Sequence, residues 1–420
     1  MNINRVNGRI DINHGIDSGE IIIDEEEQRG TRPNKFWFNN YEFMYKDVYQ
    51  KTFEDFGEVI AYKLAEKLNI ECAPYDFAIY NENFGVITKN IIKDNDNEEL
   101  ISGTEIITRV YAEYIVPLLR CKDKFNDIKN KYNIKEYSEL SELSSLEKLE
   151  LKKQFITVLS TLNIPNIKKA INKYENENIE EMSSIYQLLE ELTDLYNEDF
   201  IEMKNGIIKS NNLYDIWSVV EIYSRICDLD CDLEKFMDDL IKMFIFDIIT
   251  SQGDRHADNW SIIVNDEKKT MRLAPLYDNS GICCLNREKA IKNIVDYVDA
   301  IKNPTMHIKK KEKISSLIFS TINHNNSGLK VDYDDVVQKN KNEIMINKFF
   351  YHSSEEFNKK IIDIVRNIDE ELLLEIFKDI EENSHITIDE NVKTVVKTVI
   401  NTNIEMIKDI YDQKDVKEYV

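Results

Sequence analysis

The sequence has little glycine and proline for its length. Among 420 residues there are 11 glycines and 6 prolines, separated by long stretches rich in Ile, Leu, Glu and Lys. Because both residues interrupt helices, their scarcity favours a helix-dominated protein. A chain of this length buries a large core, and we expect two or three domains or one bilobal unit.

Cysteine is also sparse and shows no spacing typical of a metal site. The six residues are Cys72, Cys121, Cys227, Cys231, Cys283 and Cys284. Only one pair is a helical turn apart, which argues against zinc and predicts reduced thiols in a reducing compartment. The N-terminus lacks a hydrophobic signal core, and the longest apolar runs are far shorter than a membrane span. We therefore expect a cytoplasmic enzyme.

Basic residues are fewer than acidic residues in this sequence. The chain carries 54 basic and 78 acidic side chains, which gives a net charge of −24. A uniformly acidic surface opposes binding to nucleic acid and to anionic membranes, although a local basic pocket for a nucleotide remains compatible with it. The sequence therefore predicts no direct nucleic-acid partner and no membrane.

One window, residues 253 to 278, concentrates the polar chemistry: GDRHADNWSIIVNDEKKTMRLAPLYD. Asp254 and Asn259 have the spacing D-x-x-x-x-N, which lets one loop place a base beside an acceptor hydroxyl and a metal-binding amide beside phosphates. Taken singly, each is more often a helix cap or a turn residue. The prediction of a catalytic loop depends on their combination with Gly253 and His256.

A hairpin follows the loop and ends in a second acid. We expect strands at 260–264 and 271–276, joined by a polar turn at 265–269. Such a hairpin reverses the chain, so Asp278 returns close to Asn259 and completes a Mg²⁺ site. The window therefore has the outline of a kinase active site.

The N-terminal part contains the lysine and the acid that a kinase uses at the phosphates. Lys46 lies in YEFMYKDV, whose alternating large apolar residues predict a strand. Glu58 follows in EDFGEVIAYKLAEKLNI, where apolar residues recur at helical spacing. The alternatives are a solvated strand lysine and a first-turn acid favoured by the helix dipole.

The strings GDRHADN and LAPLYDN resemble the catalytic and metal-binding loops of the HipA-like kinases. Phosphoinositide kinases and their protein-kinase relatives carry a similar G-D-R-H-x-x-N loop. The resemblance implies that Asp254 is the catalytic base, that Asn259 and Asp278 bind Mg²⁺, and that His256 supports the base or the transferred phosphate. The eukaryotic HRD order is absent, and YDN stands in place of DFG.

The resemblance continues through the N-terminal part. RGTRPNKFWF is similar to the family's nucleotide-covering loop, which implies phosphate binding at Gly30 and Thr31 with charge from Arg29, Arg32 or Lys35. FGVITKNI is similar to its hinge strand, which implies nucleotide contacts at Thr88 and Lys89. The covering loop departs from the G-x-G-x-x-G pattern because it has one glycine, and an ordinary basic turn is the alternative. Thr31, and Ser280 in the loop after Asp278, are candidate phosphorylation sites, and a plain turn serine is the alternative at Ser280.

We expect an α+β, bilobal, protein-kinase-like fold with a small β-rich N-lobe and a large, mainly helical C-lobe. The N-lobe would span 1–92 and the C-lobe 93–420, with the catalytic loop at 253–259 and the metal loop at 275–281. Residues 233–249 are apolar on nearly every side and predict a central buried helix. The segment 122–212 is a possible helical insertion.

These features together predict transfer of the γ-phosphoryl group of ATP to a hydroxyl, with ATP and Mg²⁺ as cofactors. The resemblance favours a serine/threonine kinase with a protein substrate and an antitoxin-like partner. A lipid or small-molecule kinase and a catalytically silent nucleotide-binding scaffold are the alternatives. Acidic charge weakens the lipid alternative, and the presence of Lys46, Asp254, Asn259 and Asp278 weakens the scaffold.

Overall fold

The computed structural model describes residues 4–24, 34–49, 51–92, 97–133, 144–160, 213–303, 350 and 354–417. The sequence predictions for Gly30 and Thr31 lie outside these residues, as does much of 122–212. The chain forms two compact units. The first unit comprises Met1–Asp94, Met237–Trp260 and Leu273–Val420, and the second comprises Asn95–Phe236 and Ser261–Arg272. The lobe boundaries predicted from the sequence remain a prediction.

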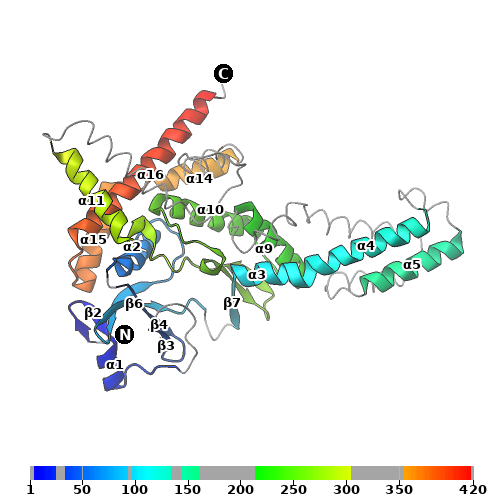
Figure 1. The fold of residues 1–420 in the computed structure, drawn as a ribbon, viewed down its shortest axis with the longest axis horizontal. Coiled ribbons are helices and arrows are strands. Elements are labelled where there is room, and N and C mark those ends of the chain that lie inside the picture. The colour runs from blue at the N-terminus through cyan, green and yellow to red at the C-terminus, as the bar shows by residue number, and fades with distance from the viewer. Residues whose placement is uncertain are drawn as a thin grey trace. The chain divides into compact units, whose positions relative to one another are not determined.

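A six-stranded sheet forms the N-terminal part of the first unit (Figure 1). Its strand order is β1-β2-β5-β6-β4-β3. Neighbouring strands are antiparallel except β2 and β5, which are parallel. The strands are β1 (Arg5–Val6), β2 (Arg9–Asp11), β3 (Lys35–Phe38), β4 (Phe43–Asp47), β5 (Tyr75–Tyr80) and β6 (Asn83–Lys89).

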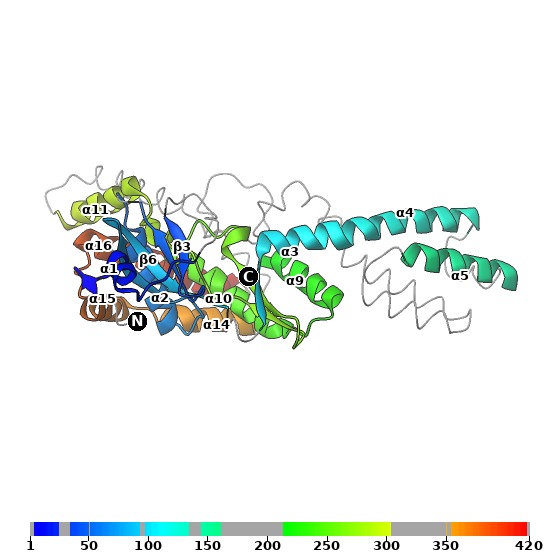
Figure 2. The ribbon, with the colours of Figure 1, turned by 90° about the horizontal axis from the view of Figure 1, so that it is seen from below.

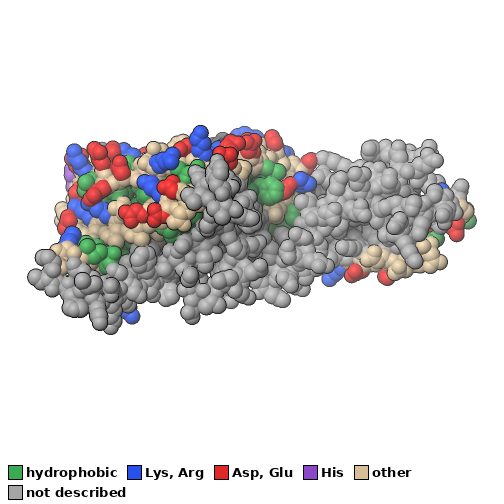
Figure 3. Space-filling view, turned by 90° about the horizontal axis from the view of Figure 1, so that it is seen from above, with side chains coloured by type: hydrophobic (Ala, Val, Ile, Leu, Met, Phe, Trp, Pro, Cys, Tyr) green, Lys and Arg blue, Asp and Glu red, His purple; other side chains and the backbone are tan. Residues whose placement is uncertain are grey.

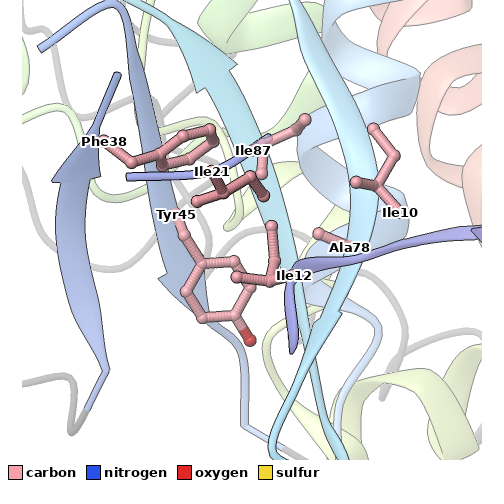
Figure 4. Packing of buried hydrophobic residues seen from close by; sticks show 7 residues of the cluster. All are labelled: Ile10, Ile12, Ile21, Phe38, Tyr45, Ala78 and Ile87. Carbon is pink, nitrogen blue, oxygen red and sulfur yellow. The ribbon is translucent and has the colours of Figure 1, made fainter. Parts of the chain in front are cut away.

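The sheet has an apolar face and a face that carries the lysine. Because side chains alternate along a strand, Tyr45 and Lys46 point to opposite faces of β4. Tyr45 packs in a buried cluster with residues of β2, β3, β5 and β6 and of the segment around α1 (Ile12–Ser18), as Figure 4 shows. The cluster consists of Ile10, Ile12, Ile21, Phe38, Tyr45, Ala78 and Ile87. Lys46 therefore projects from the other face.

Helix α2 (Glu54–Lys67) packs against the face that carries Lys46. Acids in its first turn and Lys67 in its last turn match the helix dipole. Its apolar residues bury one side, and Phe56 meets Phe77 of β5 edge to face at 5.0 Å between ring centroids. The side chains on this buried side, including that of Glu58, therefore point toward the sheet.

Helix α10 (Leu233–Thr250) leads into the catalytic loop, and its apolar residues are almost all buried, as expected for a central helix. Asn403 fixes its end, because the side-chain amide donates to the backbone oxygen of Ile249 at 3.0 Å and to the hydroxyl of Ser251 at 2.9 Å. Asn403 belongs to α16 (Glu390–Lys417).

The other described helices of the first unit are α11 (Glu288–Lys302), α14 (Glu355–Arg366) and α15 (Glu370–Ser384), together with the 3₁₀ turns η7 (Ala257–Asn259) and η8 (Ile282–Cys284).

The second unit contains a three-stranded sheet in the order β7-β8-β9 and a group of helices. Helices α4 and α5 lie side by side in it (Figure 2). The strands are β7 (Glu98–Ser102), β8 (Ser261–Asn265) and β9 (Thr270–Leu273), and the helices are α3 (Gly103–Arg109), the π-helical turn η2 (Val110–Ile115), α4 (Val116–Lys131), α5 (Ser145–Leu159) and α9 (Leu213–Cys227).

The predicted hairpin is present, but its second strand is shorter than expected. It ends at Leu273 rather than at residue 276. Leu276 is instead bonded to the segment after α2, donating to Glu71 at 2.9 Å and accepting from Ala73 at 2.7 Å. The chain leaves the hairpin early because these backbone bonds take it to a different partner.

The β-rich N-terminal sheet and the helical remainder confirm the expected α+β class. On the face drawn in Figure 3, acidic and basic side chains lie interspersed over the described surface. None of the described helices combines the length and the apolar character needed to cross a membrane.

Candidate active site

Two acids from distant parts of the chain meet at the ammonium group of Lys46. Its Nζ lies 3.3 Å from Oε1 of Glu58 on α2 and in direct contact with Oδ1 of Asp278. Lys46 and Glu58 are buried, whereas 36% of the Asp278 side chain is exposed. A shared cation offsets the cost of burying two carboxylates close together. The strand lysine, the helix acid and the metal-loop acid that the sequence singles out are therefore neighbours.

The carboxyl group of Asp278 is held in its charged form. Burial by itself would raise the pKa, but the attraction of Lys46 outweighs it, helped by Lys35 and Arg255, and lowers the pKa to about 2. The backbone at Asp278 has φ +54°, in the left-handed region. The amide of Asp278 donates to the Tyr75 hydroxyl at 3.2 Å. Lys46 and Tyr75 thus fix this acid through both its side chain and its backbone.

Glu58 also fastens the metal loop to α2. Its Oε2 accepts a hydrogen bond of 2.7 Å from the backbone amide of Asn279. Burial raises the pKa of Glu58 to about 7, against the opposing attraction of Lys46. The neighbouring Gly57 permits close approach, because a Cβ atom there would lie 2.8 Å from the backbone oxygen of Ser280. Ser280 itself is buried.

The predicted catalytic loop presents Asp254 and His256 at the surface. About 64% of the Asp254 side chain and 49% of the His256 side chain are exposed, and their nearest ionisable atoms are 3.9 Å apart. Asn259 is buried, and its side-chain nitrogen donates to the backbone oxygen of Asp254 at 2.7 Å. The loop therefore has a fixed amide at one end and an accessible acid at the other.

Arg255 joins the catalytic loop to the metal loop. Its guanidinium is fully buried and forms paired hydrogen bonds of 3.2 and 3.0 Å with Asp247 of α10. It also donates to the backbone oxygens of Asn259 and Tyr277, both at 2.8 Å, and to Oδ1 of Asn279 at 2.6 Å. One side chain thus holds the loop ends that carry both predicted metal ligands.

Gln252 adds a further link between the two loops. Its side-chain amide donates to the backbone oxygen of Asp278 at 3.1 Å, and its oxygen accepts weakly from the amide of Asp254 at 3.4 Å. The side chain of Asn279 also donates to the sulfur of Cys72 at 3.6 Å. The position of Asp278 is thus determined from several directions.

The donor set fits Mg²⁺ better than a transition metal. Asp278 supplies carboxylate oxygens, and the bond from the nitrogen of Asn259 fixes its amide with the oxygen as the available ligand atom. Among the described residues, no group of three or more His, Cys, Asp or Glu side chains is arranged to hold a metal. Mg²⁺ is commonly bound by one or two protein oxygens with phosphate and water, which matches this sparse set.

The structure places the remaining predicted residues in different ways. Thr88 is buried on β6 and pairs with Met44 of β4, so it shares the sheet face of Lys46. The side chain of Lys89 points to the opposite face and forms an ion pair with Glu42 at 3.6 Å. A nucleotide contact at Lys89 would therefore come from its backbone.

The role of Arg255 was missed by sequence reasoning, although a signal for it existed. Asp247 is an acid within the apolar run FIFDIIT of a helix expected to be buried. A buried carboxylate requires a partner, and Arg255 is a basic residue in the adjoining loop. The roles of Tyr75, Gln252 and Asn279 had no comparable signal, because each depends on contacts between distant segments.

No protein-family model and no curated protein matches the sequence. Among solved structures, the chain is similar to the Helicobacter pylori proinflammatory kinase CtkA, with 14% identity, a TM-score of 0.50 and coverage of 94% of this chain and 96% of that one. It is less similar to Shewanella oneidensis HipA, solved with HipB and operator DNA. That match has 10% identity, a TM-score of 0.39 and coverage of 96% of this chain and 71% of that one. The chain therefore shares its fold with CtkA, a HipA-like kinase.

Proposed function

We propose that this protein is a kinase that transfers the γ-phosphoryl group of ATP to a hydroxyl. One observation carries the proposal: the ammonium group of Lys46 contacts both Glu58 and Asp278. A phosphoryl-transfer site needs a lysine at the phosphates, an acid that orients it and a carboxylate for the metal. These three groups converge from a strand, a helix and a loop.

Each residue would act through the geometry that the structure gives it. Lys46, oriented by Glu58, would hold the α- and β-phosphates. Asp278 and Asn259 would hold Mg²⁺, which, when bound, neutralises charge on the phosphates. Asp254 is exposed and would accept the proton of an approaching hydroxyl or orient it. Because the transition state is loose, positioning and charge neutralisation supply most of the acceleration.

For the acceptor, we propose a serine or threonine of a protein. The resemblance of the GDRHADN and LAPLYDN loops to the HipA-like kinases supports this choice. The net charge of −24 disfavours an anionic membrane surface as the substrate. An antitoxin-like partner remains a further expectation from the same resemblance.

The test is phosphate transfer by the full chain in the presence of Mg²⁺ and ATP. Intact-mass and phosphopeptide analysis would be run on the wild type and on Asp254→Asn. Phosphate on serine or threonine of the wild type alone would support a protein kinase and show whether Thr31 or Ser280 is modified. Nucleotide binding without protein phosphorylation would redirect the search to lipid and metabolite acceptors. No Mg²⁺-dependent ATP binding would overturn the proposed function.

A further inference from the structure

Helix α2 carries a second buried acid, one turn before Glu58. Asp55 and Glu58 both lie on the side of the helix that faces the sheet. Nη2 of Arg9 on β2 lies 2.5 Å from Oδ2 of Asp55, and both side chains of this pair are buried. Each of the two acids on α2 therefore has a cation of its own from the sheet.

Arg9 extends across two aromatic rings of the sheet. Its neighbour Ile10 points into the apolar cluster on the opposite face (Figure 4), so Arg9 projects from the face that α2 covers. The guanidinium carbon lies 4.0 Å from the ring centroid of Phe84 on β6 and 5.2 Å from that of Phe77 on β5. These rings fix the position of the guanidinium over the sheet.

The two cations approach α2 from opposite flanks of the sheet. The strand order places β5 and β6, over which α2 packs, between β2 and β4. Adjacent strands are about 4.8 Å apart, so β2 and β4 are separated by roughly 14 Å, whereas residues one helical turn apart have Cβ atoms only about 5–6 Å apart. Arg9 and Lys46 thus converge on one turn of α2 from two sides. A shift of the helix toward either flank lengthens one of the two ion pairs.

The pair between Arg9 and Asp55 is a poor source of stability. Nη1 of Arg9 is buried and has no hydrogen-bond partner in the described part of the chain. Burial raises the pKa of Asp55, against the opposing attraction of Arg9. Replacing a buried ion pair by apolar residues of similar volume is often neutral or stabilising. The direct consequence of the pair is therefore that it fixes where α2 lies.

The ion pairs on the outer side of α2 are less specific. Lys63 pairs with Asp379 at 2.9 Å, and Lys67 pairs with Glu375 at 2.6 Å, both on α15. All four side chains are partly exposed, and exposed ion pairs contribute little. The buried pairs on the sheet side therefore determine the position of α2 more than these outer pairs do.

We propose that Arg9 is a positioning residue that, through Asp55, fixes α2 before any nucleotide binds. In this position Glu58 meets both Lys46 and the backbone amide of Asn279. Without the pair, α2 is held from the β4 flank alone, so Glu58 orients Lys46 less well. The inference rests on the proposed function for its effect on phosphoryl transfer, whereas the position of α2 is measurable without that function.

The test replaces the whole pair by Arg9→Met together with Asp55→Leu, called the pair-replaced variant below. Removing both charges together leaves neither of them buried alone, so this variant should fold. Asp55→Asn, which changes the shape little, takes its place if the pair-replaced variant does not fold. Arg5→Met is the matched control. Arg5 lies on the same hairpin and pairs with Asp76 at the same distance of 2.5 Å, but that pair is partly exposed and does not involve α2.

The first readout is hydrogen exchange of the Asn279 amide, which donates to Glu58. It is measured relative to the amide of Ile400, a fully buried residue of α16 that reports on global unfolding. The pair-replaced variant should speed exchange at Asn279 about tenfold or more relative to Ile400, and Arg5→Met should change it by less than about twofold. Unchanged exchange, or equal acceleration at both amides, would overturn the inference.

The second readout is kcat for phosphoryl transfer in two backgrounds. Misplacement of a positioned group costs up to about 100-fold, so the pair replacement should lower kcat about 10- to 100-fold in the wild-type background. In Glu58→Gln, it should lower kcat by less than about twofold further, because residues that act through one another are not additive. An equal fall in both backgrounds would mean that Arg9 does not act through Glu58 and would overturn the inference.

The two readouts separate this inference from the function on which it rests. If the wild type transfers no phosphate but the pair-replaced variant exchanges the Asn279 amide faster, the proposed function fails and the positioning of α2 stands. If the wild type transfers phosphate and the variant exchanges this amide at the normal rate, the inference alone is wrong.

Discussion

The two ends of the candidate site are built differently. At the end proposed to bind the nucleotide, called the nucleotide end below, Lys46 and Glu58 are almost fully buried, and the loop around Asp278 is bonded to α2, to β5 and to Arg255. At the end proposed to receive the acceptor, called the acceptor end below, about half or more of the Asp254 and His256 side chains are exposed. The nucleotide end is therefore fixed in advance, whereas the acceptor end stays open to solvent.

On the proposed function, the buried end would contribute mainly to nucleotide binding and the exposed end mainly to catalysis. Groups fixed before the ligand arrives avoid the cost of ordering and act at full strength on developing charge. An exposed base is completed only when the acceptor approaches, since catalytic hydrogen bonds often tighten only in the bound complex. We expect changes at the nucleotide end to affect binding and stability, and changes at the acceptor end to affect turnover.

The largest effect on the nucleotide end is expected from Arg255→Met. The substitution leaves the fully buried Asp247 without its partner and separates the two loops. Removing one member of a buried ion pair costs about 3–5 kcal/mol in the free energy of unfolding. Urea denaturation would measure it. Arg225→Met is the control, because that arginine is about half exposed in its pair with Glu221, and a change below about 1 kcal/mol is expected.

If Arg255→Met lowers the free energy of unfolding no more than Arg225→Met, the buried guanidinium of Arg255 is not what holds the two loops together. The backbone bonds of Leu276 and the contact of Glu58 with Asn279 would then keep the loops in place.

A pair of substitutions compares the two ends directly. Asp278→Asn should abolish Mg²⁺-dependent binding of ATP, because it removes the carboxylate ligand and the partner of Lys46. Asp254→Asn should leave binding within about twofold and slow phosphoryl transfer about 100- to 10,000-fold. Calorimetry gives the first quantity and phosphate incorporation the second. Near-normal turnover in Asp254→Asn would show that Asp254 is not the catalytic base.

A smaller effect is expected from Gly57→Ala. The added Cβ would lie 2.8 Å from the backbone oxygen of Ser280, so α2 or the metal loop must shift. Overpacking of this kind costs about 1–3 kcal/mol, and phosphoryl transfer should fall because Glu58 moves with its neighbour. Thermal unfolding and phosphate incorporation would be measured beside Glu66→Ala, an exposed position of the same helix. Equal behaviour of the two variants would mean that close approach at Gly57 is dispensable.

The smallest effect concerns pH. The pKa of Asp278 is about 2 in the folded protein against an ordinary value of 3.8, so its stabilising contribution is present above 3.8 and lost as pH falls through about 2. Because the side chain is partly exposed, solvent screening reduces the contribution to about 1 kcal/mol. The difference in unfolding free energy between wild type and Asp278→Asn should shrink by that amount on acidification. A difference independent of pH would show that Lys46 does not stabilise the charged acid.

Local patterns were sufficient to predict much of this site. Alternating apolar residues placed Lys46 on a strand, helical spacing placed Glu58 on a helix, and a polar turn between apolar runs gave the hairpin before Asp278. The apolar run of α10 predicted the central buried helix. Each of these signals depends only on residues close together in sequence.

The features that were not predicted all depend on distant partners. The second hairpin strand ends early because Leu276 pairs with the segment after α2. The pairing of β7 with β8 joins residues more than 150 positions apart. The left-handed backbone at Asp278 and the bonds from Arg255 to Tyr277 and Asn279 follow from the same long-range packing. No local pattern encodes such contacts.

The bond from Asn403 to the end of α10 has a consequence for synthesis. Helix α16 is translated after the catalytic loop, and Asn403 supplies hydrogen bonds to Ile249 and Ser251, directly before that loop. A ribosome-bound chain that ends before α16 therefore has α10 and the loop but not this support. On the proposed function, we expect phosphoryl transfer to begin only after α16 has left the ribosome and docked.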